Sequence, residues 1–109
     1  MTLRQEKINS LLKELAGSFI KRNILSGAIV TATRAEIFSN LRSAKVFISV
    51  FPEDKEKDIL GLLKNKEGEF RDFINPRLKI RFLPKVSFEI DNEIKMERHI
   101  EELLKKTAA

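Results

Sequence analysis

The stretch that decides the fold is KNKEGEFRDFINPRLKIRFLPKVSFEID, residues 64–91. Three apolar residues within 70–74 are spaced as on one face of a helix, although Gly68 precedes them among charged residues. Asn75-Pro76 then predicts the end of that helix, because proline disrupts the hydrogen bonds of a helix interior. Residues 77–82 alternate cation and hydrophobe, which is typical of a strand with one charged face. The stretch therefore predicts a broken helix followed by a basic strand.

Positive charge is concentrated in two segments of the chain. Residues 64–85 hold seven of the 21 lysines and arginines against three acids, and residues 1–22 hold five against two. Residues 23–63 are balanced, and residues 86–109 carry six acids against four bases. With a net charge of +5 and a pI near 9.6, this pattern favours a polyanionic partner such as RNA or DNA.

The composition excludes several classes of protein. A length of 109 residues with 42% hydrophobic residues predicts one packed domain, residues 1–109. The absence of cysteine excludes disulfides, thiolate catalysis and zinc sites of the cysteine type. No apolar run approaches the roughly 20 residues of a membrane span, and the amino end has no signal core, so we expect a cytoplasmic protein.

Working outward, the amino-terminal half predicts a helix and a hairpin. Apolar residues recur at helical spacing over about 4–22, which indicates an amphipathic helix. Residues 28–38 and 44–51 are rich in β-branched and aromatic residues, and Ser39-Asn40 is a plausible turn between them. These two segments are predicted to pair as an antiparallel hairpin.

The carboxy-terminal half predicts a kinked helix, a strand and a final helix. Pro52 and the acids after it open a helix whose apolar stripe resumes in phase after the weak position at Gly68, which indicates a kink. A third strand is expected over about 78–90, and Pro84 within it favours an edge position or a bulge. A short last helix is expected to start near Asn92.

Three motifs of the chain resemble the ribosome-binding factor A family: AKVFISV at 44–50, GEFR at 68–71 and PKVSFEID at 84–91. They follow one another in the family's order, with similar spacing, over nearly the whole chain. The chain departs from the family at the kink, where Lys66-Glu67-Gly68 replaces Ala-x-Gly and Glu69 separates the glycine from the phenylalanine. The resemblance implies an α+β fold of the type II KH-like class, helix-strand-strand-kinked helix-strand with a short C-terminal helix and a three-stranded sheet.

The resemblance also implies a function. Members of the family bind the small ribosomal subunit and assist late maturation of its rRNA, including processing at its 5′ end, and they are associated with growth in the cold. The resemblance therefore implies a monomeric, non-catalytic assembly factor without cofactor or metal, whose partners are the small subunit and its rRNA rather than a membrane or a small molecule. The four glycines are never three apart, so the Gly-x-x-Gly loop with which ordinary KH domains grip single strands is missing.

Two sets of cations are predicted to contact RNA. Cations at a helix break and cations spaced by two along a strand are both placed to reach phosphates, although a solvated helix face or the protection of an edge strand also explains them. The first set is Lys64, Lys66, Arg71, Arg77, Lys79, Arg81 and Lys85. A possible second margin of the footprint is Arg4, Lys7, Lys21, Arg22, Arg42 and Lys45, and Lys13 lies on the same helix as the first four.

The remaining candidates favour structural roles. Phe47 and Phe51 share one strand face and could stack on bases, but packing against the protein is the stronger interpretation. His99 has no nucleophile nearby in sequence, and the alternating acids of 89–93 are more typical of a solvated strand end than of a cation site. No P-loop, dinucleotide fingerprint or zinc-protease motif occurs, so we expect no active site.

Two other functions stay open at this point. The chain could be a general KH-like domain that binds RNA or DNA without a preference for ribosomal subunits. It could also be a protein-interaction module that uses its sheet face, in which case Phe47 and Phe51 would matter and the cations would not.

Overall fold

The computed structural model describes residues 3–24 and 27–107. Helices and strands follow one another along the chain in the order that the sequence predicts for an α+β fold. The elements are α1 Leu3–Asn23, β1 Ile29–Ile37, β2 Ser43–Phe51, a 3₁₀ turn η1 Glu53–Lys55, α2 Glu56–Asn65, α3 Glu67–Leu78, β3 Lys85–Ile90 and α4 Asn92–Thr107.

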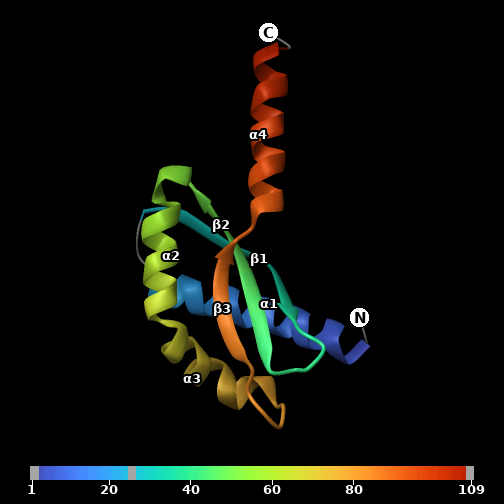
Figure 1. Cartoon of the computed structure of the whole chain (residues 1–109). Coiled ribbons are helices and arrows are strands. Elements are labelled where there is room, and N and C mark those ends of the chain that lie inside the picture. Colours follow the sequence, from blue (N-terminus) through green and yellow to red (C-terminus); the bar gives the residue numbers. More distant parts are fainter. Residues whose placement is uncertain (1–2, 25–26, 108–109) are drawn as a thin grey trace.

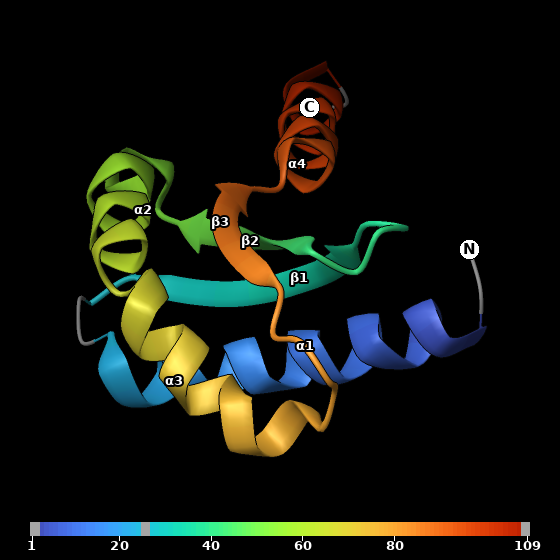
Figure 2. The same ribbon diagram turned by 60° about the horizontal axis from the view of Figure 1, so that its bottom comes forward.

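The three strands form one mixed sheet in the order β1-β2-β3 (Figure 1). β1 and β2 pair antiparallel, which confirms the predicted hairpin, and β3 joins the other side of β2 in parallel. A parallel neighbour requires a crossover, which α2 and α3 supply. Figure 2 shows α1 and α3 on one side of the sheet, whereas α4 leaves the opposite side.

Alternating residues of the strands bury one face of the sheet against the helices. On β2, Ala44, Val46, Ile48 and Val50 are buried, as the period of two in a strand requires. Phenylalanines join the layers, because the ring of Phe70 on α3 lies 5.1 Å from that of Phe19 on α1 and 5.1 Å from that of Phe88 on β3.

The prediction that a basic strand begins near residue 78 is wrong for the first half of that strand. α3 continues through Asn75-Pro76 to Leu78, and β3 begins only at Lys85, so Pro84 precedes the strand. The reason is the apolar stripe of α3, because Phe70, Ile74 and Leu78 are buried at a spacing of four. Burying a leucine gains about 1.5–3 kcal/mol, which is comparable to the cost of roughly 3 kcal/mol for a proline in a helix.

The predicted kink is confirmed and lies at Lys66, between α2 and α3, with Gly68 in the first turn of α3. The Lys66 N–H donates to the carbonyls of Leu62 and Leu63, which closes the last turn of α2. On the other side of the break, the carboxylate of Glu67 accepts a hydrogen bond of 3.1 Å from the main-chain N–H of Phe88. The break is thereby fastened to β3.

α4 begins at Asn92 as predicted but is longer than the short helix expected. It has 16 residues, none of them buried, and it projects away from the sheet in Figure 1. The apolar residues that predicted its packing, among them Ile100, Leu103 and Leu104, are exposed. Across residues 3–24 and 27–107, no helix combines the length and hydropathy of a membrane span.

Candidate nucleic-acid interface

Three segments that are distant in sequence meet at the end of the molecule near the β1–β2 turn. The first turns of α1, the turn itself and the loop between α3 and β3 enclose a groove of about 610 Å³. Its lining residues are Arg4, Ile8, Asn40, Leu41, Arg42, Ile80, Arg81 and Phe82. One arginine from each segment therefore faces the same space.

A second groove of about 460 Å³ adjoins the first along α1 and the end of α3. It shares Arg4, Ile8 and Ile80 with the first and adds Lys7 and Lys79. We call the two together the basic groove; its cations are Arg4, Lys7, Arg42, Lys79 and Arg81. Within the described part of the chain, no acid lines either half. Such a surface attracts a phosphate backbone, because each cation releases a condensed counterion on binding.

Local backbone geometry places these arginines. The Asn40 Oδ1 atom accepts a hydrogen bond of 2.9 Å from the main-chain N–H of Arg42, which tightens the hairpin turn. Leu41 in that turn has a left-handed φ of 57°, and Lys79, which ends α3, has a φ of 46°. The main-chain N–H of Lys85 donates to the carbonyl of Arg42, so the basic loop is tied to the hairpin.

Phe82 is an aromatic platform that sequence reasoning missed. The alternating pattern predicted it on the apolar face of a strand, whereas it lies in the loop with 73% of its surface exposed. The guanidinium of Arg81 lies 5.3 Å from its ring centre. An exposed ring beside cations is suited to stacking on an unpaired base. Pro84, directly before β3, was the available signal that Phe82 lies in a loop rather than in a strand.

The cations at the helix break lie in a different setting. Lys64 and Arg71 are exposed, and Lys66 is half-buried with its ammonium 3.6 Å from the carboxylate of Glu69. These residues lie at the opposite end of α3 from the basic groove. The structure therefore does not bring Lys64, Lys66 and Arg71 together with Lys79 and Arg81.

Arg77 and Arg22 meet at a third place, around Phe73. The Arg77 guanidinium lies 4.2 Å from the ring centre and donates to the carbonyl of Phe73, and the Arg22 guanidinium lies 5.9 Å from the same ring. The prediction that Arg77, Lys79 and Arg81 share one strand face is wrong, because Arg77 lies in a helix and the other two follow its end.

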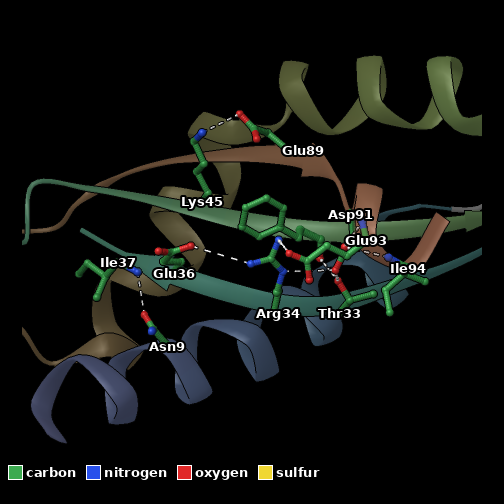
Figure 3. A network of polar contacts seen from close by, with 11 residues as sticks. Asn9, Thr33, Arg34, Glu36, Ile37, Lys45, Glu89, Asp91, Glu93 and Ile94 are labelled. Carbon is green, nitrogen blue, oxygen red and sulfur yellow. Dashed lines mark hydrogen bonds and ion pairs between the residues drawn. The ribbon is translucent and has the colours of Figure 1, made fainter. Parts of the chain in front are cut away.

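The open face of the sheet carries paired charges (Figure 3). Lys45 lies 3.3 Å from Glu89, and Arg34 lies 3.4 Å from Asp91. The guanidinium of Arg34 also lies 3.9 Å from the ring centre of Phe47, so this ring packs against the protein. Lys45 is thus outside the basic groove and already has an anionic partner.

Asp91 joins the sheet to α4, as Figure 3 shows. It is 2% exposed, and its carboxylate accepts hydrogen bonds from the hydroxyl of Thr33 and from the N–H groups of Glu93 and Ile94 in the first turn of α4. Burial alone would raise the pKa of Asp91. The hydrogen bonds from Thr33 and Ile94, with the charge of Arg34, outweigh burial and lower its pKa.

Two further sequence candidates lie outside the basic groove. His99 contacts the carboxylate of Glu53 at 2.8 Å, and this hydrogen bond is the main reason that the pKa of Glu53 is lowered. Lys21 lies with Lys13 beside β1, away from the basic groove. Among the described residues, no group of three or more histidines, aspartates or glutamates is placed to hold a metal ion.

Comparisons with known proteins agree with this fold. The family model described as ribosome-binding factor A matches residues 4–104. A ribosome-binding factor A of Clostridium novyi (strain NT) is 37% identical over 106 residues, covering 93% of this chain and 87% of the relative.

Two structures from Thermus thermophilus have the same fold. The crystal structure of its ribosome-binding factor A gives a TM-score of 0.71 at 18% identity, covering 79% of this chain and 94% of the other. A homology model of that protein, fitted into a cryo-electron-microscopy map of its 30S complex, gives a TM-score of 0.65 at 20% identity, covering 74% and 88%. The type II KH-like α+β architecture is therefore the fold of this chain.

Proposed function

This chain belongs to the ribosome-binding factor A family, and on that premise we propose that it binds the small (30S) ribosomal subunit as an assembly factor. It assists late maturation of the rRNA, including processing at the 5′ end, and it acts in the cytoplasm, where subunits are assembled. It acts as a non-catalytic monomer, with residues 1–109 as one KH-like domain. A need for the factor in the cold is part of the same proposal.

The observation that carries this proposal is the basic groove. Five cations from three segments converge there, and no acid lines it within the described residues. Lys85 extends the surface, because its main chain is bonded to Arg42. The exposed ring of Phe82 adds a surface on which an unpaired rRNA base stacks.

The mechanism follows from differential affinity. A rigid surface that fits one arrangement of folded rRNA better than another shifts the equilibrium between them by the difference in binding free energy. The groove is rigid where this matters, because the turn, the loop and α1 are tied to the sheet by main-chain and side-chain hydrogen bonds. The factor therefore acts by holding a conformation rather than by breaking a bond.

The two rival functions have weaker support. A general KH-like domain would grip single strands with a Gly-x-x-Gly loop, and this chain has none. Its glycines are Gly17, Gly27, Gly61 and Gly68. A protein-interaction module on the open sheet face would need an apolar surface, whereas that face carries the ion pairs Arg34–Asp91 and Lys45–Glu89.

Co-sedimentation of the purified protein with isolated small subunits, large subunits and assembled ribosomes tests the proposal. We expect retention on small subunits, weakening about a hundredfold between about 50 and 200 mM salt if about five phosphates are contacted. Equal retention on every particle would support a general RNA-binding domain instead. No retention at low salt would overturn both readings.

A further inference from the structure

The outer edge of β1 is open for hydrogen bonding near its beginning, whereas at its far end the main-chain N–H of Ile37 already donates to the side chain of Asn9. β1 lies at one side of the sheet and pairs only with β2 among the described strands. The main-chain carbonyl of Ile48 accepts a hydrogen bond from the N–H of Asp91, which follows β3. The main-chain N–H and C=O groups of the even-numbered residues of β2 therefore point toward β3, and those of the odd-numbered residues point toward β1. Thr31 pairs with Ser49, so the main-chain groups of its neighbours Val30 and Ala32 point away from the sheet.

This edge lacks the usual protection against strand pairing. Residues 29–32 read IVTA, with no charge and no proline, and the β-bulge lies beyond them, between Ala32 and Arg34. The opposite edge is different, because β3 follows Pro84 and carries Lys85 and Glu89. Natural edge strands are normally guarded by charges, prolines or bulges, so an unguarded one indicates a partner strand.

A groove of about 670 Å³ runs between this edge and α1, which lies alongside β1 in Figure 2. Lys13, Gly17 and Lys21 line it at a spacing of four, so they share one face of the helix. Both lysines are exposed, and neither has an ion pair within the described part of the chain. Glu14 is the single acid in the lining, which leaves the groove with net positive charge.

The spacing along α1 matches the spacing of a strand. Lys13 and Lys21 are eight residues apart, or about 12 Å along a helix axis. Residues four apart in a strand are about 14 Å apart and point to the same face. A strand that pairs with the β1 edge therefore places two of its side chains, four residues apart, near Lys13 and Lys21. The side chain midway between them lies opposite Gly17, where there is room for it, because nothing lies within 4 Å of a Cβ added to this glycine.

We propose that this edge binds an extended segment of a protein partner as a fourth strand, with the pattern acid-x-aliphatic-x-acid facing α1. Main-chain groups of Val30 and Ala32 supply the hydrogen bonds, and Lys13 and Lys21 select the acids. A second copy of this chain fits less well, because pairing two β1 edges would bring four lysines together. RNA fits less well, because it cannot continue a β-ladder. This site is separate from the basic groove and does not depend on the function proposed above.

The test uses the full chain and the peptide acetyl-Thr-Asp-Thr-Val-Thr-Asp-Thr-amide, followed by amide hydrogen exchange. In the free protein we expect fast exchange at Val30 and Ala32 and slow exchange at Thr31. When nine-tenths of the protein is bound, exchange at Val30 and Ala32 should slow about tenfold. Gly17→Leu should abolish this effect by filling the groove. The matched variant Gly61→Leu, which also has nothing within 4 Å of an added Cβ, should retain it.

Charge exchange gives an independent readout. Lys13→Glu with Lys21→Glu should lose the acidic peptide and gain a peptide in which lysines replace the aspartates. Slow exchange at Val30 and Ala32 without peptide, at any protein concentration, would overturn the proposal, since the edge would already be covered. No effect at millimolar peptide would also overturn it, as would slowing by an RNA oligonucleotide instead of the peptide.

Discussion

The helix break and the basic groove both carry clustered cations, but their surroundings differ. At the break, Lys66 is paired with Glu69, and Glu67 is used as an acceptor for the main chain of β3. In the basic groove, five cations converge without an acid in the lining among the described residues. Density of charge along the sequence therefore does not identify a binding surface; what matters is which cations the fold brings together around one groove that no acid of the described residues lines.

The largest effect should come from reversing charge in the groove. Arg42→Glu with Arg81→Glu removes two phosphate contacts and adds two repulsions, so affinity for small subunits should fall about a hundredfold. The matched pair Lys64→Glu with Arg71→Glu, also exposed, should change affinity by less than about threefold. Equilibrium co-sedimentation at fixed salt measures both, with circular dichroism to verify the fold. Equal losses would remove the distinction between the two regions.

The break should respond to mutation in stability rather than in binding. Glu67→Ala leaves the N–H of the buried Phe88 without its acceptor, which should destabilise the protein by about 1–3 kcal/mol. Glu69→Ala is the control, because its exposed ion pair with Lys66 contributes about 0–1 kcal/mol. Urea unfolding distinguishes them. If Glu67→Ala strengthened subunit binding and left stability unchanged, as loss of an acid facing phosphates would do, the structural assignment of the break would fail.

Phe82 tests whether the groove offers more than charge. Phe82→Ala should lower affinity for small subunits about tenfold, since one base stacked on an aromatic ring contributes about 1–3 kcal/mol. The stability of the protein should not change, because 73% of the surface of Phe82 is exposed. Phe51→Ala, at an exposed position on the open sheet face, should leave binding unchanged. A neutral result at Phe82 would reduce the interface to phosphate contacts.

The smallest effect concerns Asp91, which is remote from both cation clusters. Its pKa is lowered in the folded protein, so its stabilising contribution is present above its ordinary pKa near 4 and is lost as the pH falls through the folded value. We therefore expect stability to decline below about pH 4 as this group is protonated. Asp91→Asn should flatten that part of the stability–pH curve, measured by thermal unfolding. An unchanged slope would show that Asp91 is not the group responsible.

Apolar spacing was sufficient to predict most of the fold. The first helix and the resumption of the α2 stripe in α3 follow from periodicity, because each buries one face, and the hairpin follows from two segments rich in β-branched and aromatic residues around a turn. The error at residues 77–81 arose where two rules conflict. Proline normally ends a helix, but burial of Leu78 carried α3 past Pro76. The alternating cations after it then mimicked a strand.

The basic groove could be predicted only in part. Lys79, Arg81 and the possible margin at Arg4, Lys7 and Arg42 were identified from charge, but nothing local indicates that they converge. Their meeting depends on left-handed backbone at Leu41 and Lys79, where the sequence has no glycine to signal it. It also depends on contacts between segments about forty residues apart, which charge counts along a single sequence do not report.

The salt dependence of binding to small subunits, compared between the native chain and the two double reversals, tests the central claim most directly. Neutralising about five phosphates predicts a slope of log affinity against log salt of about −3.5 for the native protein. Arg42→Glu with Arg81→Glu should reduce the slope by about 1.4, while Lys64→Glu with Arg71→Glu should leave it unchanged. A slope that flattens for the helix-break variant and not for the groove variant would contradict the account.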